Sequence, residues 1–117
     1  MSELGSQAVA AVQAVVERGD EADAILRQAV AELADRYGAF AGVRFVEEDE
    51  MVLGPAAGVP APVATAVPVR FRDATVAELV TSAELDADDL AAWQRIAELV
   101  GPYCLVGWDT GGEGWVP

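Results

Sequence analysis

The sequence contains no histidine, no lysine and no asparagine, and its only cysteine is Cys104. Without histidine, catalysis by Ser-His-Asp or Cys-His groups and histidine-ligated metals are excluded. Without lysine there is no Schiff-base chemistry and no P-loop, and without asparagine there is no glycosylation sequon. One cysteine cannot form an intrachain disulfide or a thiolate metal cluster. We therefore expect no cofactor and no metal, and a cytoplasmic location fits best.

Positive charge is scarce. The seven cations are all arginines, against twenty acidic residues, which leaves a formal net charge of −13 and a pI of about 4.1. Such a surface repels phosphate backbones and anionic lipids, so we expect neither nucleic acid nor a membrane as partner. No apolar run is long enough to span a bilayer, and the first residues lack the basic start of a signal peptide.

Hydrophobic residues make up 53% of the 117 positions, enough for one packed domain over 1–117. Apolar residues recur at helical spacing in the first segment and predict a helix over 3–18 that ends at Gly19. A second amphipathic pattern predicts a helix over 21–37, with Asp20 at its start and Gly38 at its end.

Alternating residues then predict a strand at 42–47, a polar hairpin tip at 47–50 and a short strand from Met51 to near Gly54. The acidic tip could hold calcium, but it lacks the spaced ligand loop, so a solvated turn is the preferred interpretation. A connector over 54–64 follows, with three of the six prolines.

A second hairpin is expected over 66–82, and its register decides which side chains are buried. A two-residue loop would bring Glu78 beside Val69 on the apolar face. We prefer a three-residue loop at 72–74, because burying an unpaired carboxylate is costly. That loop leaves Arg70 and Glu78 on the outer face and gathers an apolar set on the inner face: Val67, Val69, Phe71, Ala77 and Leu79.

The last expected helix begins at the N-cap Asp86 and is interrupted at Gly101-Pro102. The remaining tail, 102–117, is apolar and then glycine-rich, and contains Trp108 and Trp115. These tryptophans could anchor a partner or pack on the domain's own core. For Cys104, beside Leu105 and Val106, a buried thiol is favoured over a reactive one.

The stretch 66–100 resembles the C-terminal half of GAF domains. Pro68 matches the usual strand proline, Ala77 and Leu79 match a small residue followed by a large aliphatic one, and 86–89 matches the acidic helix start. A looser similarity covers 21–54. The resemblance implies an α+β fold, with an antiparallel sheet of about four strands and the N-terminal and C-terminal helices packed on one face.

The same resemblance implies limits on function. A typical GAF domain has several dozen residues between its second strand and the proline strand, where this chain has only about 55–65, so we expect an absent or shallow pocket. The cyclic-nucleotide signature needs asparagine and lysine, the bilin type needs a cysteine in the missing region, and the methionine-sulfoxide reductase type needs several cysteines. No catalytic or cofactor-binding residue therefore carries over.

Three arginines, Arg44, Arg70 and Arg72, could contact an anion. The alternative is that they lie on a solvent-facing side of the sheet, paired with Glu78 or with the acidic helices. Acidic pairs such as Asp20 and Asp23 are better explained as helix caps and surface charge than as a general acid and base.

The first helix, within 1–19, has a broad apolar stripe although two other helices already cover the sheet. We therefore expect a homodimer with a helical interface. The expected partner contacts are Leu4, Ala8, Val12, Val15, Val16, Trp108 and Trp115. The predicted function is a non-enzymatic regulatory module that senses a small molecule or holds a partner protein. The alternatives are a purely structural interaction domain and, less favoured, a small-molecule enzyme.

Overall fold

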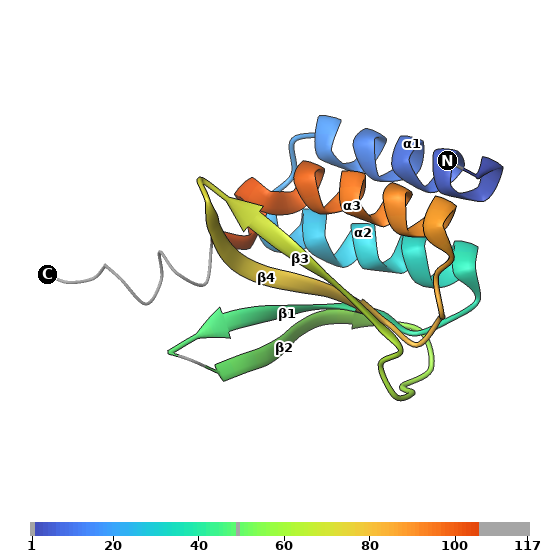
Figure 1. The fold of residues 1–117 in the computed structure, drawn as a ribbon. Coiled ribbons are helices and arrows are strands. Elements are labelled where there is room, and N and C mark those ends of the chain that lie inside the picture. The colour runs from blue at the N-terminus through green and yellow to red at the C-terminus, as the bar shows by residue number, and fades with distance from the viewer. Residues whose placement is uncertain (1, 49, 106–117) are drawn as a thin grey trace, which may run out of the picture.

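The computed structural model describes residues 2–48 and 50–105. Three α-helices and four β-strands are followed by a short 3₁₀ helix, η1 (Figure 1). Their bounds in chain order are α1 Glu3–Glu17, α2 Ala22–Tyr37, β1 Ala41–Glu47, β2 Glu50–Ala57, β3 Thr65–Phe71, β4 Ala74–Thr81, α3 Ala87–Val100 and η1 Gly101–Leu105.

The four strands form one antiparallel sheet in the order β2-β1-β4-β3. The helices α2 and α3 pack on one face of this sheet, and α1 packs on α2 and α3 from outside (Figure 1). The predicted α+β fold class, with the helices on one face, is therefore confirmed. No helix of the described residues covers the other face, which we call the open face.

Both edge strands contain a proline, Pro55 in β2 and Pro68 in β3. Proline has no N–H to donate to a neighbouring strand, so it weakens an edge as a template for further pairing. The edges of this sheet are thus poorly suited to extension by another chain.

The core lies between the helix layer and the sheet. Trp93 of α3 is fully buried, and its ring meets Tyr37 of α2 edge-to-face at 5.5 Å between centroids. Strand residues Val43, Val67 and Leu79 supply the opposite wall of the same cluster. Aromatic pairs in this geometry add to the stabilisation that burial provides.

The apolar stripe of α1 packs against other helices of the same chain. Ala8, Val12 and Val15 are at most 1% exposed, because α1 packs against α2 and α3. These three predicted dimer contacts therefore offer no surface to a second copy while α1 stays packed. Leu4 is 36% exposed and Val16 is partly buried, so these two retain accessible surface.

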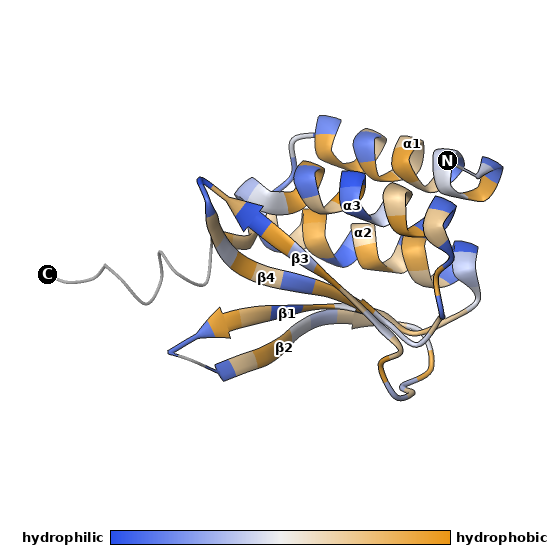
Figure 2. Cartoon of the chain, viewed as in Figure 1, coloured by the Kyte–Doolittle hydropathy of each residue, from blue (hydrophilic) through white to orange (hydrophobic). Residues whose placement is uncertain are grey.

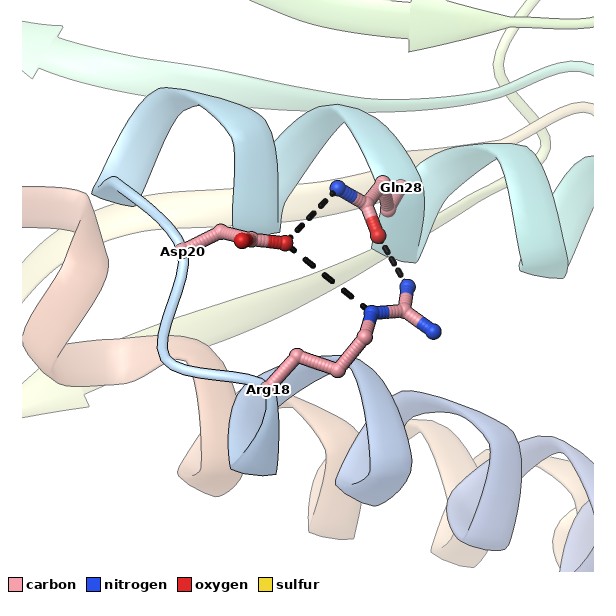
Figure 3. Close-up of polar contacts among 3 residues, drawn as sticks. All are labelled: Arg18, Asp20 and Gln28. Carbon is pink, nitrogen blue, oxygen red and sulfur yellow. Dashed lines mark hydrogen bonds and ion pairs between the residues drawn. The ribbon is translucent and has the colours of Figure 1, made fainter.

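The turn between α1 and α2 corrects the predicted start of the second helix. Glu21, not Asp20, holds the N-cap position, and its side chain makes no capping hydrogen bond. Asp20 instead accepts a hydrogen bond of 3.2 Å from the Gln28 side chain and lies 3.9 Å from Arg18 (Figure 3). Arg18 also donates to Gln28, so the three side chains join the two ends of the turn.

A carboxylate at the start of α3 connects all three helices. The side chain of Asp86 accepts from the backbone N–H of Asp89, which confirms Asp86 as the N-cap. Oδ1 of Asp89 accepts hydrogen bonds from Ser2, the N-cap of α1, and from the Tyr37 hydroxyl at the end of α2. The pKa of Tyr37 is raised to about 12, mainly by desolvation and to a lesser extent by the hydrogen bond to Asp89.

The second strand is longer than predicted. It continues from Glu50 to Ala57, where a strand to about Gly54 was expected, and Ala56 and Ala57 still pair with β1. A β-bulge in this part of the pairing accommodates Pro55, which an edge strand tolerates. At the predicted acidic tip, residue 49 lies outside the described residues.

The second hairpin has the predicted faces but not the predicted loop. Val67 pairs with Leu79 and Val69 pairs with Ala77, and all four are buried, while Glu78 lies on the other side. The loop, however, has two residues, 72 and 73, both with positive φ. A bulge next to the Val69 pair absorbs one residue of β4, so the inner face is preserved without the three-residue loop.

The chain continues from α3 into η1, where Cys104 is fully buried. Burial raises the pKa of this thiol to about 12, so the thiol is held protonated and unreactive, as expected. Trp108 and Trp115 lie outside the described residues. Within the described part, no helix has the length and hydrophobicity needed to cross a bilayer.

Candidate ligand-binding cleft

A cleft of about 550 Å³ opens where the connector between β2 and β3, residues 58–64, lies over one end of the open face. Strands β1, β2 and β4 supply one wall and the connector supplies the other. The lining residues are Phe40, Arg44, Leu53, Ala56, Ala57, Gly58, Pro60, Ala61, Val63 and Val80. Figure 2 shows that β2 and the connector are mainly hydrophobic, whereas the tips of both hairpins are hydrophilic.

The floor of the cleft contains a buried residue outside the main core. In β4, Ala77 and Leu79 face the helices, so the alternation of the strand turns Val80 toward the open face. Val80 is nevertheless 0% exposed, and Phe40 beside it is only 8% exposed. The connector therefore shields this end of the open face from water.

Gly58 sets how closely the connector approaches the sheet. Its φ is +86°, and a Cβ at this position would come within 2.7 Å of the carbonyl oxygen of Ala39. Only glycine fits both the backbone conformation and this approach. At the other end of the connector, the N–H of Ala64 donates to the carbonyl of Thr81 in β4. The wall of the cleft is thus attached at both ends.

Arg44 is the one charged side chain among the described lining residues. It pairs with Glu78 on the neighbouring strand, where Nη2 lies 2.7 Å from Oε1. The two side chains are 32% and 28% exposed, so their charges are only partly solvated. Nε of Arg44 is buried and has no hydrogen-bond partner among the described residues.

The three arginines of the predicted anion contact have different neighbours. Arg44 is paired with Glu78, as the alternative interpretation expected. Arg70 donates a hydrogen bond of 3.1 Å to the backbone carbonyl of Asp73 in the hairpin turn. Arg72 lies over the Phe71 ring, 5.1 Å from its centroid. Of the three, only Arg44 lines the cleft.

A second hollow of about 410 Å³ lies on the other side of the connector, toward the end of α2. It shares Phe40, Gly58 and Ala61 with the cleft and adds Gly38 and Ser82. The backbone of Phe40 exchanges two hydrogen bonds with Ser82, which places the end of α2, β1 and β4 against each other. The second hollow therefore lies between the connector and the C-terminal end of α2.

The apolar residues of the cleft were not predicted from the sequence. Ala56 belongs to the part of β2 that was interpreted as a connector, Leu53 lies in the expected strand but was not assigned to a site, and Phe40 precedes the expected first strand. The available signal in the sequence was valine within the proline-rich connector, at Val59 and Val63, because loops are usually polar. Among residues 2–48 and 50–105, no cluster of acidic or cysteine side chains could hold a metal ion.

Comparisons with known proteins bear on the fold. No known family's sequence profile matches the chain, and no curated protein matches it. Its structure is similar to the GAF domain of a phosphoenolpyruvate-protein phosphotransferase from Acinetobacter, with a TM-score of 0.74, over 98% of this chain and 100% of that chain. The sequence identity is 9%, so the similarity shows the fold alone. The chain has a GAF-like fold, as the resemblance implied.

Proposed function

We propose that the chain is a non-catalytic regulatory module that senses a small molecule in the cleft on the open face. The GAF-like fold supports a regulatory or sensory kind of module. The observation that carries the proposal is the cleft of about 550 Å³ under the connector. Its volume falls within the range of roughly 300–1,000 Å³ that is typical of small-molecule sites.

The composition of the cleft also favours ligand binding over a purely structural role. Its walls are mainly apolar, and Arg44 supplies a polar group that can orient a bound molecule. The reduced middle region led us to expect an absent or shallow pocket. The connector offsets that loss, because it lies over Val80 and Phe40 and forms the second wall of the cleft.

A bound molecule would act through the connector. Gly58 and Ala61 line hollows on both sides of it, and Phe40 lies three residues after the end of α2. Displacement of the connector would shift Phe40 and the end of α2, and hence the packing of the helix layer. This is the step by which ligand occupancy would change the surface that the helices present.

A metabolite screen by thermal unfolding tests the proposal. A ligand present at about 100 times its dissociation constant stabilises the native state by about 2.7 kcal/mol, which raises the Tm measurably. The substitution Ala61→Trp places a large side chain at the exposed wall of the cleft and should abolish the shift. Ala91→Trp, at an exposed position on α3, is the matched control and should keep it. If no metabolite stabilises the protein, the structural alternative is favoured.

Homodimerisation remains a proposal, and fewer of the expected contacts are available for it, because Ala8, Val12 and Val15 are buried within the chain. Leu4 and Val16 are the predicted contacts on α1 that keep accessible surface. Light scattering of the full chain and of Leu4→Glu tests it, with a dimer expected for the former and a monomer for the latter. A monomeric full chain would refute the dimer but would leave the ligand proposal intact.

A further inference from the structure

We infer that the cleft takes an uncharged, mainly apolar small molecule that carries one hydrogen-bond acceptor toward Arg44. The inference rests on the proposed function, and it names the chemical class of the ligand. It is carried by the Arg44–Glu78 pair and by the apolar character of the other lining residues.

The polar group of the cleft has no net charge. The Arg44 guanidinium lies 2.7 Å from the Glu78 carboxylate, and both side chains are about two-thirds buried. Together they form a neutral pair, because the charge of each is balanced by the other. A ligand carboxylate or phosphate at Arg44 would bring a second negative charge close to Glu78 in a partly desolvated site, where repulsion is strong.

Arg44 retains hydrogen-bond donors that Glu78 does not use. A guanidinium has five N–H donors, and the described contacts engage only one of its nitrogens, Nη2, with Glu78. The ion pair holds the planar group in one orientation. A neutral acceptor, such as the carbonyl oxygen of an amide, ester or ketone, can use a remaining donor without adding charge to the site.

The rest of the cleft surface is apolar. The lining residues other than Arg44 are alanine, glycine, proline and larger apolar side chains, so most of the ligand must be apolar to gain from burial. The whole chain carries a formal charge of −13, which lowers the local concentration of anions. Both features disfavour nucleotides and sugar phosphates as occupants.

Phenylacetamide and phenylacetate are suitable probes, because they have similar shapes and differ in charge. Each is titrated into the wild-type protein and followed by amide-resolved NMR. The amide should shift resonances of the cleft lining, including Arg44, Ala56, Gly58 and Val80. The acid should bind the cleft about tenfold more weakly, because its carboxylate is repelled by the carboxylate of Glu78.

The substitution Glu78→Gln tests whether the charge of Glu78 causes the preference for a neutral ligand. This variant keeps the side-chain shape and leaves Arg44 unbalanced, so the cleft becomes positive. Affinity for phenylacetate should rise about tenfold, while affinity for phenylacetamide should change little. Glu98→Gln, which removes an exposed carboxylate on α3, is the matched control and should leave the preference of the wild type unchanged.

The ligand class and the proposed function are tested separately by these experiments. If the wild type binds phenylacetate in the cleft as tightly as the amide, or if Glu78→Gln leaves the ratio unchanged, the ligand class is wrong although the cleft binds ligands. If neither probe shifts cleft resonances at millimolar concentration, the inference is also overturned. The proposed function then depends on the metabolite screen, which includes charged compounds and fails only if none of them stabilises the protein.

Discussion

The Ser2 hydroxyl donates a hydrogen bond of 2.6 Å to Oδ1 of Asp89, although the two residues are 87 positions apart. The same oxygen accepts a bond of 3.1 Å from the Tyr37 hydroxyl. Oγ of Ser2 also accepts from the backbone N–H of Gly5 and so caps α1. One partly buried carboxylate therefore ties together the start of α1, the end of α2 and the first turn of α3.

Removing this carboxylate should destabilise the whole helix layer. We expect Asp89→Ala to lower the free energy of unfolding by about 1.5–3 kcal/mol, the range for hydrogen bonds to a charged group. Urea denaturation measures the change. Asp35→Ala, at an exposed aspartate of α2, is the matched control and should stay within about 0.5 kcal/mol of the wild type. Equal losses in the two variants would show that Asp89 does not join the helices.

Stability should fall at alkaline pH. The pKa of Tyr37 is raised from 10.0 to about 12, mainly by desolvation, and burial raises that of Cys104 from 9.0 to about 12. The folded state therefore holds protons that the unfolded state releases. The stabilisation is complete below about pH 9 and is lost as the pH rises toward 12.

Denaturation at a series of pH values checks this dependence. Tyr37→Phe should flatten the decline above pH 10, and Cys104→Ala should flatten its start near pH 9, because each removes one titrating group. A pH profile that is the same in both variants as in the wild type would contradict these assignments. Both variants should be compared with the wild type at pH 7, so that lost packing is separated from lost titration.

The stripe of α1 should behave as part of the core. Val12 is 0% exposed, so Val12→Ala should cost about 2 kcal/mol through lost burial and the cavity that remains. Leu4→Ala removes a larger side chain that is 36% exposed, and should cost less than about 1 kcal/mol. If Leu4→Ala were the more damaging change, α1 would not be packed as described.

The approach of the connector can be tested with two glycines. Both Gly19 and Gly58 have positive φ, but a Cβ at Gly19 meets nothing within 4 Å, whereas at Gly58 it meets the Ala39 carbonyl at 2.7 Å. Gly19→Ala should therefore cost only the backbone strain of about 1–2 kcal/mol. Gly58→Ala should cost clearly more and should weaken binding of any cleft ligand. Similar costs for both would mean that the connector can move aside freely.

Local sequence patterns predicted the helices and hairpins well, because the features that determine these elements lie within each segment. The periodicity of α1, α2 and α3 lies within one segment, and Asp86 caps α3 with its own side chain. Gly38 ends α2 in the left-handed conformation that glycine favours. The limits of β2 were harder to predict, because pairing with β1 carries the strand through Pro55, where local preference favours a break.

The candidate site could be predicted only in part. Arg44 and Glu78 were both noted, and the alternative interpretation included an arginine paired with Glu78. That Arg44 is the partner follows from the adjacency of β1 and β4, which the sequence did not predict. The cleft itself was not predicted, because it depends on where the connector lies relative to the open face. Nothing in the pattern of 58–64 says that it lies over Val80, which is distant in the sequence.

The sequence by itself determined which chemistries are excluded, where the helices and hairpins lie, and which side of the second hairpin is buried. These depend on residue types and on the alternation of apolar positions. Only the tertiary structure decided that the apolar stripe of α1 is buried against α2 and α3, that a bulge replaces a longer loop, and that the connector covers Val80 to leave a cleft. Those outcomes depend on the free energy of contacts between distant segments, which no local pattern contains.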